Sequence, residues 1–136
     1  MNTSDNTYIW HLDARRDNLQ LLRIILNERT TRLDFGYQTT DIYYHGVWIN
    51  IFPETHLKSN LSEKKYRMQD QANIVLSPDK FHFKSRADWH FFSLNFAPLS
   101  FQDQTLSLIE AEIPDSTHFN ISHIHLICNQ AMLLKL

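Results

Sequence analysis

The stretch WHFFSLNF at residues 89–96 decides the fold class of this chain. In an extended strand one face carries His90, Phe92, Leu94 and Phe96, and the other carries Trp89, Phe91, Ser93 and Asn95. Aromatic residues favour strands, and here they occur on both faces. We therefore predict a strand that is covered on both sides, as in a β-sandwich or a small barrel.

Shorter segments of the same character precede this strand. Residues 47–52 (VWINIF) alternate aliphatic side chains with Trp, Asn and Phe, and Pro53 closes them. Residues 74–76 (IVL) and 81–83 (FHF) are two further short strand candidates. The middle of the chain is therefore predicted to be mainly β, with the polar stretch 58–65 as a candidate linker.

The polar segment 84–88 is short enough to close a hairpin between residues 81–83 and the strand at 89–96. A turn centred on Arg86 would place His82 opposite His90, with both side chains on the same face of the sheet. The sequence therefore predicts two neighbouring imidazoles.

Both ends of the chain show the spacings of three and four that are typical of helices. At the N-terminal end, residues 18–29 form a candidate helix rich in Leu, Gln, Asn and Arg, although residues 19–26 fit a buried strand equally well. We predict a helix there. Its proposed apolar face carries Leu22, Ile25, Leu26 and Arg29.

A second helix is predicted from Asn120, a suitable N-cap, to the end of the sequence at Leu136. No stop signal precedes Leu136, so we expect this helix to continue in the natural protein and to suit a partner helix. Its apolar stripe consists of Ile121, Ile124, Cys128 and Ala131.

Composition excludes several classes of function. The 136 residues are 43% hydrophobic and 21% charged, which suits one domain with its own core. Thirteen Lys and Arg against fifteen Asp and Glu give a net charge of −2, so the sequence lacks the excess of positive charge that nucleic-acid binding relies on. No run approaches the ~18 apolar residues of a membrane span, and two glycines cannot build a phosphate-binding loop. A single cysteine and no leader indicate a cytoplasmic location.

The eight histidines raise the question of a metal site. His123 and His125 are two residues apart, so in a helix they point in different directions and cannot share an ion. Three histidines on or near predicted strands remain: His45, His82 and His90. Converging inside a barrel they would form a divalent-metal site, with Glu54 as the nearest carboxylate. Alternatively they donate hydrogen bonds or line a pocket.

Residues 70–98 combine these features in a recognisable order. A short strand runs into Pro78, three residues separate Pro78 from His82, and after a polar turn Trp89 begins a strand that ends at Phe96. This order resembles the second half of the sensor domain of AraC-type transcriptional regulators, which is a cupin-like double-stranded β-helix, or jelly-roll barrel.

Upstream, Tyr44-His45 and residues 48–52 are similar to the histidine-bearing first strand of that family. Two departures stand out. Gln71-Ala72 replaces the family's usual Gly-Asp, and the metal motif of cupins is reduced to His45. The resemblance therefore implies a barrel that senses a ligand and carries no metal, no other cofactor and no catalytic activity.

The resemblance also implies a domain arrangement. Residues 1–40 would form an N-terminal arm or helix, residues 41–115 the cupin-like barrel, and residues 116–136 the start of a helical dimerisation segment. The helix-turn-helix units that read DNA in that family are absent from this chain, so DNA would be contacted only through a missing domain.

The leading hypothesis is therefore an effector-sensing and dimerisation domain of a transcriptional regulator. A small effector that is not strongly ionic would bind in the barrel, lined by His45, Trp48, His82, His90 and Phe92. A homodimer would form through Ile121, Ile124, Cys128 and Ala131. One alternative is a stand-alone metal-dependent cupin enzyme that uses His45, His82 and His90. Another is a filled barrel that serves only for self-association or for contact with another protein.

Overall fold

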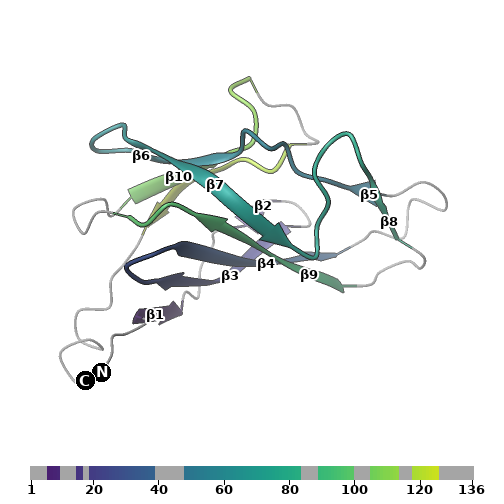
Figure 1. The fold of residues 1–136 in the computed structure, drawn as a ribbon, viewed down its shortest axis with the longest axis horizontal. Helices are drawn as coiled ribbons and strands as arrows, with labels where there is room; N and C mark the ends of the chain where they lie inside the picture. Colours follow the sequence, from purple (N-terminus) through teal and green to yellow (C-terminus); the bar gives the residue numbers. More distant parts are fainter. Residues whose placement is uncertain are drawn as a thin grey trace.

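The computed structural model describes residues 6–9, 15–16, 19–38, 48–83, 89–99, 105–113 and 118–125, and all regular structure in these ranges is β (Figure 1). The strands are β1 (Asn6–Ile9), β2 (Arg15–Arg16), β3 (Leu19–Leu26), β4 (Thr31–Gln38), β5 (Trp48–Ile49), β6 (His56–Ser59), β7 (Lys65–Ala72), β8 (Phe81–His82), β9 (Trp89–Phe96), β10 (Thr105–Ile109) and β11 (Ile121–His125). The predicted mainly β class is confirmed.

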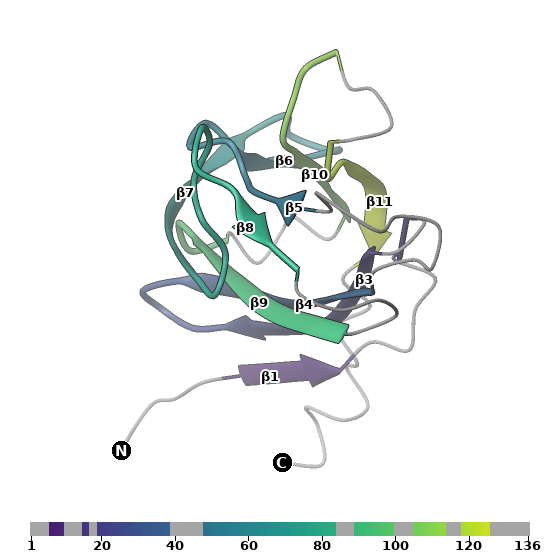
Figure 2. The same ribbon diagram turned by 90° about the vertical axis from the view of Figure 1, so that its right-hand side faces the viewer.

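The main sheet is antiparallel and curls into a half-barrel (Figure 2). Its strand order is β1–β3–β4–β9–β7–β6–β10–β11, and β2 pairs with β3. Three strands, β3, β7 and β11, each contain one extra residue relative to a neighbour, at a shift in the pairing register. Such β-bulges bend a strand and increase its twist. They therefore help the sheet to curl around one core.

β9 covers the residues 89–96 that the sequence predicted, and it lies between β4 and β7 in the sheet. On its inner face Phe92, Leu94 and Phe96 are buried. On its outer face Trp89 is 47% exposed and Phe91 is 55% exposed. The prediction that both faces are covered is therefore wrong for this end of the strand.

The core lies inside the half-barrel and draws side chains from most of its strands. The fully buried apolar members include Leu21, Ile24, Leu33, Phe35, Ile51, Leu57, Tyr66, Leu106, Leu108 and Ile124. Burying a large side chain of this kind stabilises a fold by roughly 1.5–3 kcal/mol. A single core of this size joins the N-terminal strands to the rest of the chain.

A two-stranded ribbon of β5 and β8 stands at one end of the half-barrel (Figure 1). The predicted strands at 47–52 and 81–83 are thus present in shortened form. Residues 74–76 do not form the predicted strand, but Leu76 makes a parallel bridge to Ile51. The Ile51 amide donates to the Val75 carbonyl at 3.0 Å.

The predicted helix over residues 18–29 is wrong, because residues 19–26 form β3 between β1 and β4. The proposed apolar face of that helix is not the buried one, because none of Leu22, Ile25, Leu26 and Arg29 is fully buried. The bulge at Leu22 interrupts the alternation of buried residues. Leu19, Leu21 and Ile24 all face the core, so their spacing changes from two to three. The alternative prediction, a buried strand over residues 19–26, is the one that agrees with the structure.

The predicted helix after Asn120 is wrong over residues 121–125, which form β11. Ile121 and Ile124 pair with Leu108 and Leu106, two residues apart on β10, so β11 carries the extra residue. A helix-like spacing of three again results from a bulge. The remaining residues of that predicted helix, 126–136, lie outside the described residues.

The strands β1, β2, β4, β6, β7 and β10 were not predicted. β7 reads KYRMQDQA, and only its Tyr66 is buried, so its pattern lacks the alternation that marked β9. The candidate linker at 58–65 contains the end of β6, the turn at residues 60–64 and the first residue of β7, and these two strands pair with each other. Within the described ranges we find no helix of the length and apolarity that crossing a bilayer requires.

Candidate ligand-binding site

Two of the predicted pocket residues, His90 and Phe92, lie on the inner face of β9 in a cluster of aromatic rings. Phe92 stacks on Phe35, with ring centroids 5.2 Å apart, and its centroid lies 6.1 Å from that of Phe119. The His90 ring stacks on Phe81 at 4.3 Å. Because Phe92 is only 3% exposed, it belongs to the core.

The predicted neighbouring pair of imidazoles is wrong. β8 pairs with β5, which places His82 opposite Trp48. β9 pairs with β4, which places Tyr37 opposite His90. Since successive side chains of a strand point to opposite faces, the aromatic residue Phe81 contacts His90, while His82 is exposed.

Trp48 and His82 belong to the exposed surface of the β5–β8 ribbon. Trp48 is 41% exposed, and the Lys80 ammonium lies 4.6 Å from the centroid of its ring. His45 lies outside the described residues. In the part of the chain that the structure describes, no three His, Cys, Asp or Glu side chains are grouped so that they could hold a metal ion.

The predicted dimerisation residues have a different role where the structure describes them. Ile121 is 5% exposed and Ile124 is 1% exposed, and both pack in the core from β11. Buried side chains are not available to a partner helix. Cys128 and Ala131 lie outside the described residues.

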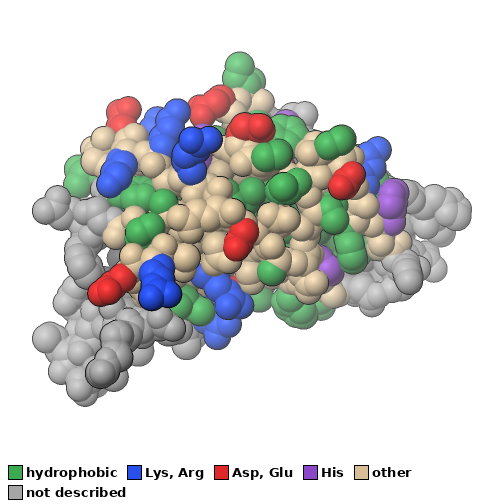
Figure 3. Space-filling view, viewed as in Figure 1, with side chains coloured by type: hydrophobic (Ala, Val, Ile, Leu, Met, Phe, Trp, Pro, Cys, Tyr) green, Lys and Arg blue, Asp and Glu red, His purple; other side chains and the backbone are tan. Residues whose placement is uncertain are grey.

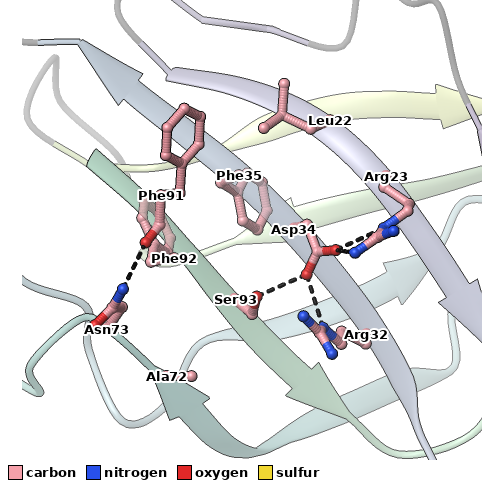
Figure 4. A pocket seen from close by; sticks show the side chains of 10 residues that line it. All are labelled: Leu22, Arg23, Arg32, Asp34, Phe35, Ala72, Asn73, Phe91, Phe92 and Ser93. Carbon is pink, nitrogen blue, oxygen red and sulfur yellow. Dashed lines mark hydrogen bonds and ion pairs between the residues drawn. The ribbon is translucent and has the colours of Figure 1, made fainter. Parts of the chain in front are cut away.

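The structure has a pocket on the outer face of the main sheet, with a volume of about 610 Å³. We call it the outer pocket (Figure 4). It is formed where β3, β4 and β9 meet the end of β7. Ten residues line it: Leu22, Arg23, Arg32, Asp34, Phe35, Ala72, Asn73, Phe91, Phe92 and Ser93. Phe92 is the one residue of the predicted ligand-binding set among these ten. Arg32 and Asp34 are outward-facing here because they alternate along β4 with the buried Leu33 and Phe35.

Asp34 lies at the centre of a charged cluster in this pocket (Figure 4). Its Oδ2 atom accepts hydrogen bonds from Nε of Arg23 at 2.8 Å and lies 2.7 Å from Nη2 of the same residue. Its Oδ1 atom accepts from Nε of Arg32 at 2.7 Å and from Oγ of Ser93 at 2.6 Å. These contacts satisfy both carboxylate oxygens of a side chain that is only 13% exposed.

Burial raises the pKa of Asp34, but the hydrogen bonds from Ser93, Arg32 and Arg23 and the charge of Arg32 lower it by more. The pKa of Asp34 therefore lies below its ordinary value, and the carboxylate is ionised at neutral pH. Two guanidinium groups and one carboxylate leave this cluster with a net charge of +1.

Each arginine side chain is 45% exposed, although its Nε atom is held by Asp34. Three guanidinium nitrogens have no hydrogen-bond partner among the described residues. They are both Nη atoms of Arg32 and Nη1 of Arg23. Their N–H groups are therefore available to a ligand.

Phe91 forms the aromatic side of the outer pocket, and Trp89 lies beside it. The two rings are nearly parallel, with an angle of 8° between their planes and centroids 6.1 Å apart. Both cover Gly36 on the neighbouring strand, where a Cβ atom would lie 3.2 Å from each ring. The absence of a side chain at Gly36 makes room for both rings, which are about half exposed.

Asn73 closes the pocket at the end of β7. Its backbone has a φ of 66°, a conformation that Asn adopts more readily than most residues. Its side-chain amide donates to the Phe91 carbonyl at 3.1 Å, and its own carbonyl oxygen is hydrogen-bonded to Nε2 of His90. Asn73 therefore fixes this corner against β9.

Sequence reasoning missed Arg23, Arg32, Asp34 and Ser93 as functional candidates. One signal was present. Asp34 stands between Leu33 and Phe35 at a polar position of an alternating segment, and Arg32 is two residues away, on the same face of a strand. The contribution of Ser93 had no local signal, because 59 residues separate it from Asp34.

Comparison with known proteins adds no relative: no family model, no curated protein and no solved structure matches this chain.

Proposed function

We propose that this chain is an effector-sensing domain and that its effector, a small molecule, occupies the outer pocket. The observation that carries this proposal is the pairing of two half-exposed guanidinium groups with an exposed aromatic ring around a space of about 610 Å³. A few polar groups around an otherwise apolar concavity are typical of small-molecule sites.

The side chains of the outer pocket suit binding because the strands hold them in place. Arg23, Arg32, Asp34 and Ser93 come from three adjacent strands and are connected through Asp34. Groups that are fixed before a ligand arrives lose little conformational entropy on binding. The carboxylate holds the arginines, and their remaining N–H groups and the Phe91 ring are the contacts offered to a ligand.

The resemblance to AraC-type regulators supplies the context of this proposal. In that context the half-barrel is part of a cupin-like jelly roll in a homodimeric cytoplasmic regulator, and a helix-turn-helix domain follows it. The curled antiparallel sheet supports this assignment only at the level of the fold class. Regulation would require the effector to bind two states with affinities that differ by roughly 1–3 kcal/mol.

A direct role in nucleic-acid binding is not proposed for these residues. On the face shown in Figure 3, the Lys and Arg side chains of the described residues are interspersed with Asp and Glu. Association with DNA relies on a basic surface.

The coding sequence beyond Leu136 tests the regulator class: two helix-turn-helix patterns support it, and any other continuation rejects it.

The metal-dependent cupin enzyme is the alternative that the sequence left open. It requires His45, His82 and His90 to converge. His82 lies opposite Trp48 while His90 stacks on Phe81, so the described residues do not favour this alternative.

The sensing role is tested by blocking the outer pocket without removing any of its hydrogen bonds. Ala72 is exposed and lines the pocket, so Ala72→Phe fills the space and leaves the Asp34 cluster intact. A panel of neutral, anionic and cationic small molecules is screened by the shift in melting temperature. We expect at least one compound to stabilise the wild-type chain and the control Arg29→Ala but not Ala72→Phe.

Arg29 is a matched control because it is an exposed arginine in the turn between β3 and β4, away from the pocket. A panel in which no compound stabilises the wild type, or in which every stabilising compound also stabilises Ala72→Phe, would reject the outer pocket as the effector site.

A further inference from the structure

We infer that the ligand of the outer pocket is a planar aromatic monocarboxylate, bound with its carboxylate on Arg23 and Arg32 and its ring against Phe91. This inference rests on the proposed function and specifies the chemical class of the ligand. It replaces the expectation of an effector that is not strongly ionic, because Arg23 and Arg32 line the pocket.

The first argument is charge. The Asp34 cluster carries a net charge of +1, which one carboxylate neutralises. A ligand with two or more negative charges would meet one further acidic group, Asp70, on the same face. Asp70 is hydrogen-bonded to Asn95 at 2.6 Å, and Asn95 lies directly opposite Arg32 in the sheet. The site therefore favours a monoanion over a phosphate or a polyanion.

The second argument is the shape of the donors. A guanidinium is planar, and its N–H groups match the two oxygens of a carboxylate. Asp34 binds the Nε atom of each arginine and so orients each guanidinium. No other described residue occupies the Nη atoms of Arg32 or Nη1 of Arg23, so these stay available to a ligand. The sheet thus presents donors already aligned for a carboxylate.

The third argument is the aromatic ledge, by which we mean the rings of Phe91 and Trp89 over Gly36. The two rings are nearly parallel to each other, and each side chain is about half exposed, so another aromatic ring can stack on them. Phe91 and Ser93 are two residues apart on one face of β9, a separation of about 7 Å along a strand. Ser93 is hydrogen-bonded to Asp34, and Phe91, Arg23 and Arg32 all line the same pocket, so one ligand of one or two rings can contact the ledge and the arginines together.

The test compares three probes. Two share the naphthyl ring and differ in charge, and the third is smaller and carries the charge on a non-aromatic ring. 2-Naphthoate has the ring and the charge, 2-naphthamide has the ring without the charge, and cyclohexanecarboxylate has the charge without an aromatic ring. Dissociation constants are measured by calorimetry, and the site is located from amide chemical-shift changes at Phe91 and Ser93. We expect 2-naphthoate to bind about tenfold more tightly than 2-naphthamide and about fivefold more tightly than cyclohexanecarboxylate.

Variants separate the two contacts. Arg32→Lys keeps the charge but loses the planar donors, and we expect it to weaken 2-naphthoate about tenfold while leaving 2-naphthamide unchanged. Phe91→Leu keeps an apolar side chain at an exposed position, so it does not threaten folding, and it should weaken both naphthyl probes and not cyclohexanecarboxylate. Arg29→Lys is the matched control and should change none of the three.

The inference is overturned if 2-naphthamide binds as tightly as 2-naphthoate, if Arg32→Lys leaves 2-naphthoate unaffected, or if no probe binds. The sensing role is judged separately by the Ala72→Phe screen. A compound that passes that screen while all arylcarboxylates fail leaves the sensing role in place and rejects this ligand class.

Discussion

At the scale of single residues, Asp34 shows how a charged group on a sheet is stabilised. Its carboxylate has two arginines and a serine as partners and a pKa below the ordinary value. The folded state therefore binds fewer protons at this site than the unfolded state. The resulting stability is present in full above the unfolded pKa of about 3.9 and is lost as pH falls through the folded pKa.

Replacing this carboxylate tests the sign of that effect. We expect Asp34→Asn to lower the free energy of unfolding by about 1–3 kcal/mol at pH 7, because a charged hydrogen-bond acceptor is lost. The difference from wild type should shrink below about pH 4. Urea denaturation across this pH range measures it, with the exposed Asp79→Asn as control. A difference that stays constant down to pH 2.5, about 1.4 units below the unfolded pKa, would contradict the argument.

Gly36 acts at the same scale through the space it leaves open. A Cβ atom there would lie 3.2 Å from the rings of both Phe91 and Trp89, which is tighter than ordinary contact. Because both rings are exposed, they can move away, so we expect Gly36→Ala to change stability by less than about 1 kcal/mol. The displacement of the Phe91 and Trp89 rings should weaken 2-naphthoate binding severalfold, which calorimetry measures. Unchanged binding would show that the aromatic ledge is unimportant.

At the scale of elements, a buried glutamate joins distant parts of the chain. Glu110, at the end of β10, accepts hydrogen bonds from the Phe52 amide at 3.0 Å and the Phe119 amide at 2.6 Å. In Glu110→Gln one oxygen becomes an NH₂ group that cannot accept. We expect a loss of about 1–3 kcal/mol in the free energy of unfolding, measured in urea.

Glu112→Gln is the matched control for that variant. The Glu112 side chain is 67% exposed and lies 3.6 Å from His56 Nε2, its nearest ion-pair partner among the described residues. Surface pairs of this kind contribute little. Equal effects of the two substitutions would show that Glu110 does not join these segments.

β11 gives the second test at this scale. Ile124 is a core residue, so Ile124→Ala leaves a cavity. We expect it to lower the free energy of unfolding by about 2–5 kcal/mol. Chemical denaturation measures this cost, and sedimentation measures the oligomeric state. A variant that loses a dimer while keeping its stability would restore the dimerisation role that the sequence predicted for Ile124.

At the scale of the whole molecule, the sheet depends on contacts between residues far apart in the sequence. β4 pairs with β9 along its full length, from Thr31 opposite Phe96 to Gln38 opposite Trp89. Such non-local pairings must close long loops before they stabilise the fold, so all-β domains of this kind fold in milliseconds to seconds. We expect stopped-flow refolding in this range, and a main phase in microseconds would contradict this topology.

The sequence by itself determined the β class and the full extent of β9, because an alternating pattern without a bulge is a local property. It did not reveal β3 and β11, because each contains a bulge that changes the spacing of buried residues from two to three. The outer pocket was decided only by the tertiary structure. Arg23, Asp34 and Ser93 lie on three strands and meet through strand pairing, which the local sequence does not encode.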